Sequence, residues 1–315
     1  MATVIAASET RMGGAPVITV FGSINLDLIG NVDRLPRPGE TVPGGAFSTS
    51  PGGKGANQAL AAARAGARVR MVGAVGRDAF ATAALALLKA GGVELSRVRQ
   101  VDEPTGVALI LVDPAGENVI AVLPGANGTV SEADASGLEF GPEDVLLLQL
   151  EVPIPAIAGT ARRAREAGAR VLLSFAPFRA DALHLLPLAT HLVVNESECE
   201  LIAKALGLGG EGTEAQAVSL ADRLESTVIA TLGKHGVLAA GPGRVERAAA
   251  LQVEAIDTVG AGDTFCGYLG AALTEGMTFR AALALASTAA SVACIKPGAQ
   301  PAVPMREEVA RSCQA

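Results

Sequence analysis

Apolar positions follow two alternating patterns from Val17 onward. Short runs rich in valine, leucine and isoleucine have the length of buried strands, and the alanine-rich stretches between them have the length of helices. The short runs predict strands at residues 17–21, 69–75, 145–150, 171–175, 191–194 and 228–231. The longer stretches predict helices at residues 56–65, 79–90, 155–167, 196–205, 214–224, 262–274 and 279–295. This alternation predicts a doubly wound α/β fold, in which helices sandwich a mostly parallel sheet.

Two segments interrupt this alternation. Residues 28–50 are rich in proline and glycine, and the β-rich runs 105–112 and 118–123 are joined by turn residues. We predict that they form a small antiparallel β lid that closes over a substrate and excludes water. The lid then comprises residues 28–50 and 104–124, and the α/β domain comprises residues 16–27, 51–103 and 125–315. Residues 1–15 lack periodicity and are predicted to be a disordered tail.

The charge balance argues against a nucleic-acid partner. The 315 residues carry 32 acidic and 25 basic side chains, a formal net charge of -7, whereas nucleic-acid binding requires clusters of lysine and arginine. The longest uncharged apolar run, residues 281–295, is shorter than the roughly 20 residues that span a bilayer. The first residues also lack the pattern of a secretory signal. We therefore expect a cytoplasmic protein without nucleic-acid or membrane partners.

The strongest chemical signal is the segment 257–265, DTVGAGDTF, which lies just before a predicted helix. Small residues at Gly260, Ala261 and Gly262 allow backbone N–H groups to converge at a helix N-terminus, where the helix dipole favours an anion. Asp263 follows this anion hole directly and is placed to accept a proton from an attacking hydroxyl. Two alternatives are a dinucleotide fingerprint, which would need glycine where Phe265 stands, and a turn that merely starts a helix.

A second signal is the glycine-rich segment 52–59, GGKGANQA. It permits close backbone approach to a ligand, and Asn57 can donate and accept hydrogen bonds to sugar hydroxyls. It is not a Walker A loop, because Lys54 is followed by Gly55 rather than by serine or threonine. Taken alone, this segment is also compatible with a flexible turn that caps a core helix.

The two motifs, in this order, resemble the ribokinase family of carbohydrate kinases, also called the phosphofructokinase-B family. The resemblance extends over nearly the whole chain. Four further segments support it: residues 22–27 (GSINLD), 195–198 (NESE), 231–236 (TLGKHG) and 298–301 (GAQP). The resemblance implies an ATP-dependent kinase that phosphorylates the primary hydroxyl of a small sugar, with D-ribose as the leading candidate and D-ribose 5-phosphate as the product.

The resemblance also implies roles for individual residues. Asp263 would be the catalytic base, beside an anion hole formed by residues 260–262. The sugar would be bound by Asn25, Asp27, Gly53, Lys54, Asn57 and Glu151, together with Asp263. The nucleotide would be bound by Asn195, Glu198, Thr231, Gly233, Gly236 and Ser287. Glu198 would hold Mg²⁺ largely through water, because this ion keeps several waters when bound.

Members of this family bind a monovalent cation, usually K⁺, beside the anion hole. The matching positions here are Asp257, Val259, Ala293, Lys296, Gly298 and Ala302. Ala302 stands where these kinases often carry serine, so one side-chain ligand would be missing. Relatives with similar lids often form homodimers, and pairing two lids would cover their exposed strand edges.

Other functions stay open on the sequence alone. The elements GGKGANQA and GAQP resemble kinases of ribose most, yet deoxyribose, fructose, a sugar acid or a nucleoside could be the substrate. A non-catalytic sugar-binding protein on the same fold is a more remote alternative, because it would not need an intact Asp263. A nicotinamide-dependent oxidoreductase is the third alternative.

Overall fold

The computed structural model describes residues 14–313, so the predicted tail lies outside the described residues except for its last two positions. Within this range a nine-stranded sheet has the order β13-β12-β11-β10-β9-β8-β1-β4-β5. Its strands are β1 Ile18–Phe21, β4 Val69–Gly76, β5 Glu94–Val101, β8 Val145–Leu148, β9 Arg170–Ser174, β10 His191–Asn195, β11 Thr227–Thr231, β12 Val237–Gly241 and β13 Arg244–Ala248. Strands from β5 to β11 pair in parallel, whereas β12 and β13 pair antiparallel at one edge.

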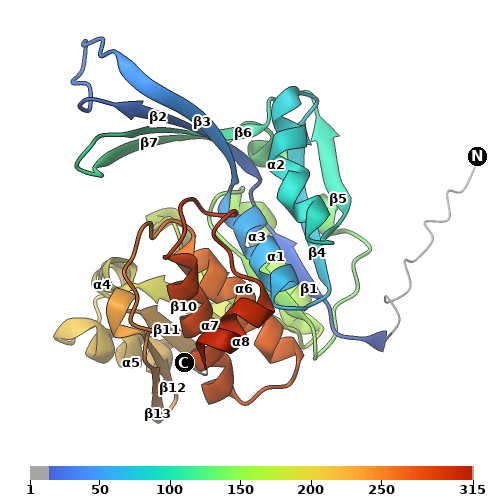
Figure 1. Cartoon of the computed structure of the whole chain (residues 1–315). Coiled ribbons are helices and arrows are strands. Elements are labelled where there is room, and N and C mark those ends of the chain that lie inside the picture. Colours follow the sequence, from blue (N-terminus) through green and yellow to red (C-terminus); the bar gives the residue numbers. More distant parts are fainter. Residues whose placement is uncertain (1–13, 314–315) are drawn as a thin grey trace, which may run out of the picture.

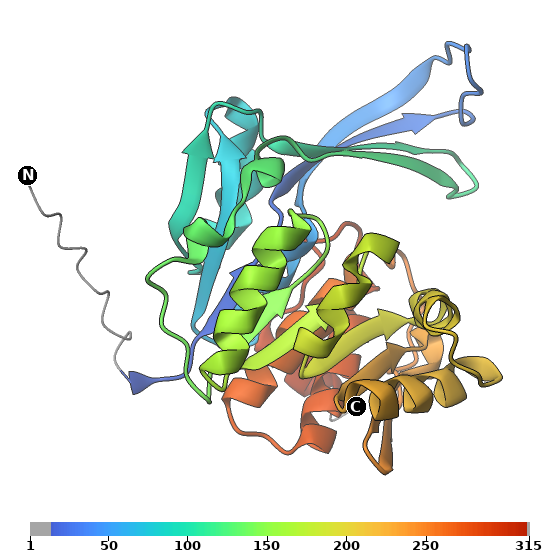
Figure 2. The ribbon, with the colours of Figure 1, turned by 180° about the vertical axis from the view of Figure 1, so that it is seen from behind.

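Helices cover both faces of this sheet (Figures 1 and 2). They are α1 Lys54–Arg64, α2 Ala79–Ala90, α3 Ile154–Glu166, α4 Glu196–Ala205, α5 Gly212–Leu224, α6 Ala261–Thr274, α7 Phe279–Ala293 and α8 Arg306–Ser312. Short 3-10 helices are η2 Gly125–Thr129, η3 Glu132–Ala135, η4 Ala180–Leu188 and η5 Gly233–His235. One apolar core packs under α1, α2, α6, α7 and α8, and the other packs under α3, α4 and α5.

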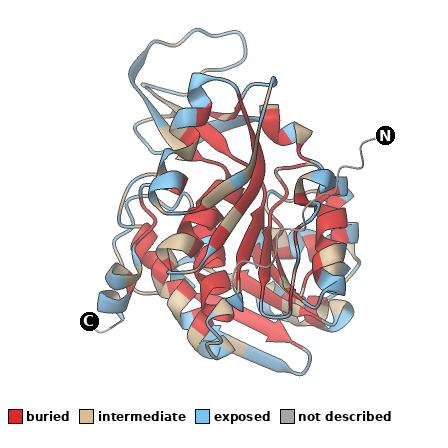
Figure 3. Cartoon of the chain, turned by 90° about the vertical axis from the view of Figure 1, so that its right-hand side faces the viewer, coloured by how far each residue is buried: buried red, intermediate tan, exposed pale blue. Residues whose placement is uncertain are grey.

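The strand sequences explain why there are two cores. Successive side chains of a strand point to opposite faces of the sheet, so a strand buried on both faces must be apolar at every position. In β8, Val145 and Leu147 belong to one core, and Leu146 and Leu148 belong to the other. Figure 3 shows these central strands as buried along their length. The predicted fold class, a mostly parallel sheet sandwiched by helices, is confirmed.

A second sheet of four strands, in the order β3-β2-β6-β7, extends away from the main body (Figure 1). Its strands are β2 Asn25–Val32, β3 Gly44–Gly52, β6 Gly106–Val112 and β7 Asn118–Leu123. The β2/β3 and β6/β7 pairs are antiparallel hairpins, as predicted, while β2 and β6 pair in parallel. That this sheet acts as a lid, and the residue boundaries of the lid, stay predictions.

Some elements were missing from the sequence prediction. Strand β5 is an edge strand in which charged and polar residues outnumber apolar ones, so its sequence lacks the continuous apolar run of a central strand. Strands β12 and β13 form an antiparallel hairpin around the turn at Gly243, which departs from the strand-helix alternation. Helix α8 has only 7 residues. No helix among residues 14–313 combines the length and the apolar composition that crossing a membrane requires.

Helices α1 and α6 approach each other unusually closely at Gly267. A Cβ atom at this position would lie 2.5 Å from Ala61 Cβ, 2.6 Å from Gln58 O and 2.7 Å from Ala62 N. Two of these contacts are with backbone atoms of α1, which cannot move without shifting the helix. The absence of a side chain at Gly267 therefore sets the distance between the two helices.

Replacing Gly267 by alanine is expected to lower the free energy of unfolding by about 1–3 kcal/mol, the usual cost of overpacking. Gly270→Ala in the same helix is the matched control, because its Cβ would first meet the movable Leu147 Cδ2 at 3.3 Å. Both changes gain the same helix propensity, so their difference isolates the steric effect. Chemical denaturation measures it, and equal stability of the two variants would contradict this account.

Candidate active site

Two strand ends and two helix starts meet at one edge of the main sheet. Strand β1 leads into Ser23 and β8 leads into Glu151, and the Ser23 hydroxyl donates to Glu151 Oε2 at 2.5 Å. Helices α1 and α6 meet through Asn57 and Asp263, whose side chains are 2.9 Å apart. Ligands of open α/β sheets bind outside the carboxyl ends of the strands, which is this edge.

Asp263 lies in the first turn of α6 and is only 8% exposed. Its two carboxylate oxygens accept hydrogen bonds from two amides of α1: Asn57 Nδ2 donates to Oδ2 at 2.9 Å, and Gln58 Nε2 donates to Oδ1 at 3.0 Å. Such bonds fix the plane of a carboxylate. The structure therefore holds Asp263 in one orientation at the start of the helix.

Lys54, the first residue of α1, lies among several acidic groups. Its backbone N–H donates to Glu151 Oε2 at 3.0 Å. The pKa of the Lys54 ammonium is raised, chiefly by the charge of Asp263 and also by Glu151 and Glu198, while burial opposes this effect. One lysine thus links the charges of acids that come from three separate segments of the chain.

Asp27 lies in strand β2, at the base of the small sheet, and its carboxylate packs where a Cβ atom on Gly52 would stand. Burial, followed by the charge of Glu151, raises the pKa of Asp27 from 3.8 to about 6, and the Lys54 charge partly offsets this. The raised pKa means that nearby positive charge does not compensate for the burial of the ionised carboxylate. A hydrogen-bonding ligand would relieve that condition.

Asn25 is 3% exposed and is held by Asn127, which sequence reasoning did not single out. Asn127 Nδ2 donates to Asn25 Oδ1 at 2.7 Å and to Ile24 O at 3.1 Å. Gly53 fits against this corner because its φ is 87° and a Cβ atom there would lie 2.7 Å from Asn25 N. Asn25, Gly53, Lys54 and the acids described above are therefore brought together.

The predicted anion hole is a glycine turn at the start of α6. Gly260 has φ 78°, a left-handed conformation that favours glycine, and a Cβ atom there would lie 3.0 Å from Ala299. At Gly262 a Cβ atom would meet nothing within 4 Å, so the space beside it is open. The first turn of a helix leaves its N–H groups without intrahelical partners, which suits an anion.

Asn195 and Glu198 form a capping box at the start of α4. Glu198 N donates to Asn195 Oδ1 at 2.8 Å, and Asn195 N donates to Glu198 Oε2 at 2.9 Å. Burial, the larger effect, and the charge of Asp263 raise the pKa of Glu198, and Lys54 and the bond from Asn195 lower it. Because β10 ends at Asn195 and α4 follows it directly, Glu198 lies at the carboxyl edge of the sheet, as the sugar-site candidates do.

Three nucleotide-site candidates lie around the β11/β12 turn. Thr231 ends β11, and its hydroxyl donates to Val194 O at 3.3 Å. Gly233 and Gly236 both have positive φ, and a Cβ atom on Gly236 would lie 2.1 Å from Ala248 O. Ser287, on α7, is 5% exposed and contacts the segment that also packs on Gly236. Its hydroxyl donates to Ala249 O at 3.0 Å, so it is used to hold the segment after β13.

Two loops carry the predicted cation ligands. The Asp257 carboxylate joins them, because Oδ1 accepts from Val259 N at 2.9 Å and Oδ2 accepts from Gly298 N at 2.8 Å. Ala293 ends α7, and Ala302 is fully buried. The Lys296 ammonium turns to Glu308 Oε1 at 2.6 Å, which leaves its backbone carbonyl as the group available to an ion.

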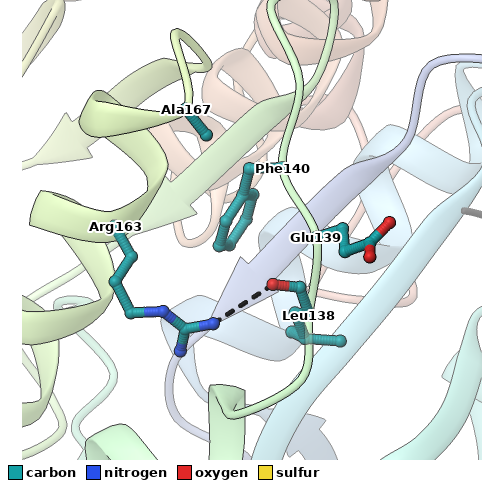
Figure 4. Close-up of a pocket in the computed structure, with 5 residues that line it drawn as sticks. All are labelled: Leu138, Glu139, Phe140, Arg163 and Ala167. Carbon is teal, nitrogen blue, oxygen red and sulfur yellow. Dashed lines mark hydrogen bonds between the residues drawn. The ribbon is translucent and has the colours of Figure 1, made fainter. Parts of the chain in front are cut away.

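A pocket elsewhere on the surface offers no comparable chemistry. It has a volume of about 410 Å³ and is lined by Leu138, Glu139, Phe140, Arg163 and Ala167 (Figure 4). These residues precede β8 or end α3, so the pocket lies at the amino ends of the strands, opposite the acids described above. The Arg163 guanidinium donates to Ala135 O at 2.9 Å and to Leu138 O at 3.1 Å, so it serves the fold.

A buried carboxylate beside an open helix N-terminus, at the carboxyl edge of a doubly wound sheet, suits the transfer of a phosphoryl group to a hydroxyl. The fold and the site thus point to the class of small-molecule kinases. Comparison with known proteins gives the family: the profile described as pfkB family carbohydrate kinase matches residues 16–306. The chain belongs to the pfkB family of carbohydrate kinases.

Individual relatives agree with this assignment. The ribokinase of Haemophilus influenzae is 36% identical over 295 residues, which cover 92% of this chain and 96% of that protein. The crystal structure of a Thermotoga maritima ribokinase has a TM-score of 0.87 at 31% identity and covers 95% of this chain and 100% of its own. An Arabidopsis thaliana ribokinase complexed with ribose and ATP has a TM-score of 0.84 at 29% identity, covering 96% and 99%.

Asp27→Asn is expected to stabilise the protein at pH 8 but not at pH 4. The folded state binds a proton on Asp27 with a pKa of about 6, against an ordinary aspartate pKa of 3.8. Stability from this group is therefore fully present below about pH 4 and is lost as the pH rises through 6. The two pKa values differ by an amount worth on the order of 3 kcal/mol.

The measurement is the free energy of unfolding of the parent and the variant at both pH values. Their difference removes the contributions of all other titrating groups. A difference that is the same at pH 4 and pH 8 would show that Asp27 does not carry the raised pKa.

Proposed function

We propose that this protein is an ATP-dependent sugar kinase that transfers a phosphoryl group to the primary hydroxyl of D-ribose and forms D-ribose 5-phosphate. The observation that carries the proposal is the buried carboxylate of Asp263, held by two amides beside the open turn at residues 260–262. Ribokinase relatives that match nearly the whole chain support ribose as the acceptor.

Asp263 is the base in this proposal. It accepts the proton of the primary hydroxyl as the hydroxyl oxygen attacks the γ-phosphoryl group, and ADP leaves. Backbone N–H groups of Gly260, Ala261 and Gly262 stabilise the charge on the transferred group. The open space beside Gly262 fits this role, because no side chain occupies the place of the phosphoryl oxygens.

The sugar is held by polar groups from the base of the small sheet and the start of α1. The proposed contacts are Asn25, Asp27, Gly53, Lys54, Asn57 and Glu151, together with Asp263. Asn57 Oδ1 is buried without a partner among the described residues, so it can accept a hydrogen bond from a hydroxyl. The pKa of Asp27, raised chiefly by burial, is consistent with a carboxylate that would gain from a hydrogen-bond donor of the sugar.

The nucleotide is proposed to lie along Asn195, Glu198, Thr231, Gly233 and Gly236, with Ser287 near the base. Glu198 would hold Mg²⁺ through water, and its pKa, raised chiefly by burial, fits an acid whose charged form would gain from a nearby cation. The ion would neutralise phosphate charge. No cluster of three or more potential metal-ligating side chains occurs within residues 14–313, and water-mediated binding of Mg²⁺ does not require one.

A monovalent cation, K⁺, is proposed at the joined loops. Its ligands would be Asp257, Val259, Ala293, Lys296, Gly298 and Ala302, mostly through backbone carbonyls. The hydrogen bond between Gly298 N and Asp257 Oδ2 already brings the two loops together. Because Ala302 has no side-chain oxygen, this site would have one ligand fewer than a serine would give.

Measuring ADP release with ribose, deoxyribose, fructose and adenosine in turn tests the substrate. Turnover is expected to be fastest with ribose. Faster turnover with another acceptor would mean that this acceptor, and not ribose, is the preferred substrate. Absence of ADP release with every acceptor would favour a non-catalytic sugar-binding protein.

Asp263→Asn is expected to lower kcat by roughly 10²- to 10⁴-fold, the usual size for loss of a general base. The amide is similar in shape, so the fold is expected to persist, and circular dichroism would confirm this. Asp222→Asn, on the exposed face of α5, is the matched control and should leave kcat unchanged. Near-normal turnover of Asp263→Asn would end the assignment of the base.

We also propose a homodimer through the small sheet, in the cytoplasm, where ATP is supplied. Ile120 and Val122 of β7 are 50% and 48% exposed. Strand register places Val122 beside Ala108 and Asp27, so these apolar groups lie on the same face as Asp27. A second copy covering this face would remove apolar area from water.

The parent protein is therefore expected to have a dimer mass in light scattering, and Ile120→Lys is expected to shift that mass toward the monomer. The lysine would place a charge in the buried centre of the interface. A monomeric parent protein would overturn the dimer and leave the catalytic proposal untouched.

A further inference from the structure

Two glutamines lie behind the proposed base, and neither has a role in the mechanism above. Gln58 follows Asn57 on α1, and Gln149 follows β8 at its carboxyl end. Both side chains are 0% exposed. Gln58 Nε2 donates to Asp263 Oδ1 at 3.0 Å, and Gln149 Nε2 donates to Gln58 Oε1 at 2.6 Å. The three residues therefore form a chain of hydrogen bonds that ends at the carboxylate.

The chain has only one consistent direction. An ionised carboxylate accepts hydrogen bonds and cannot donate them, so it must face the NH₂ group of Gln58. This leaves Gln58 Oε1 to accept, and Gln149 must then present its own NH₂ group. Gln149 Oε1, at the far end, is buried without a partner among the described residues. It lies against Gly22, where a Cβ atom would be only 1.9 Å away.

This arrangement costs stability. Burying an amide oxygen without a partner is unfavourable, and apolar side chains of similar size could fill the same space. Gln58 lies on the α1 face that packs against α6, and Gln149 lies in an otherwise apolar segment that runs from β8 to Leu150. A structural role alone would be served better by methionine or leucine. The two glutamines are therefore better explained by the Asp263 carboxylate, which their hydrogen bonds hold in place, than by packing alone.

We propose that Gln58, oriented by Gln149, is a positioning residue that holds the Asp263 carboxylate at the angle needed to accept the sugar proton. The inference rests on the proposed function of Asp263. Asn57 holds the other oxygen and also contacts the sugar in that proposal, whereas Gln58 is fully buried and acts only through Asp263. Small displacements of a reacting group can lower rates by roughly 10²-fold.

The first variant is Gln58→Met, which keeps the length and apolar volume of the side chain and removes its hydrogen bonds. We expect kcat with ribose to fall by roughly 10- to 100-fold, with KM for ribose and ATP within about twofold of the parent. A residue that only supports the fold would change the melting temperature without this selective loss of kcat. Unchanged kcat in a folded Gln58→Met variant would overturn the proposal.

The second variant, Gln149→Met, tests the orienting step. We expect a smaller loss of kcat in this variant, again without a change in KM. Because Gln149 reaches Asp263 only through Gln58, the double variant should have the kcat of Gln58→Met alone. Additive losses would show that Gln149 acts by another route and would overturn its role. If Gln58→Met does not fold, the kcat of Gln149→Met alone tests the proposal. An unchanged kcat in that variant would contradict the proposed role of the hydrogen-bonded glutamines.

Thr160→Val is the matched control. Thr160 Oγ1 is also buried without a hydrogen-bond partner, but it lies on α3, on the opposite face of the sheet. Its replacement removes a buried polar group and should leave kcat unchanged. The parent protein and Asp263→Asn are measured alongside. A parent without turnover would remove the proposed function and this inference together, whereas an active parent with a normal Gln58→Met variant removes the inference alone.

Discussion

The close packing of helices α1 and α6 is the constraint on which the site depends. Because Gly267 has no side chain, the backbone of α6 lies against that of α1, and the first turns of both helices start at the same edge of the sheet. This brings Asn57 and Gln58 within hydrogen-bond distance of Asp263. The α1 motif and the α6 motif, about 200 residues apart in sequence, therefore form one site because a core position leaves no room for a Cβ atom.

A second set of contacts joins this site to the small sheet. Ala299 packs on Gly260, at the turn that begins α6, and the neighbouring Gln300 donates through Nε2 to Gly52 O at 3.3 Å. Gly52 ends β3, where the small sheet meets the main body. One short segment thus touches both the glycine turn and the base of the small sheet, and it contains Gly298, which binds Asp257. The position of the small sheet and the conformation of the glycine turn at Gly260 are therefore coupled through the contacts of this one segment.

Much of this could be predicted from the sequence, since strand-helix alternation and the two glycine motifs are local signals. The fold class and the hairpins of the small sheet follow from such patterns. The partners of the motif residues could not be predicted, because Asn127 and Gln149 meet Asn25 and Gln58 only through the folded topology. A polar residue in an otherwise apolar segment, as at Gln149, was a usable signal. The hydroxyl of Ser287 was placed near the base by resemblance, and its bond to Ala249 O depends on tertiary contacts.

The charges at the site bear on the cations of the proposed function. Asp27, Glu151, Glu198 and Asp263 surround the single ammonium of Lys54, which cannot neutralise all of them. Burial, followed by the charge of a neighbouring acid, raises the pKa values of Asp27 and Glu198. A polyphosphate entering the same space would add further negative charge and would be repelled by the acids. In the proposed function, helix N-termini and bound cations must therefore supply the missing positive charge, and the acids that hold the sugar make that requirement stricter.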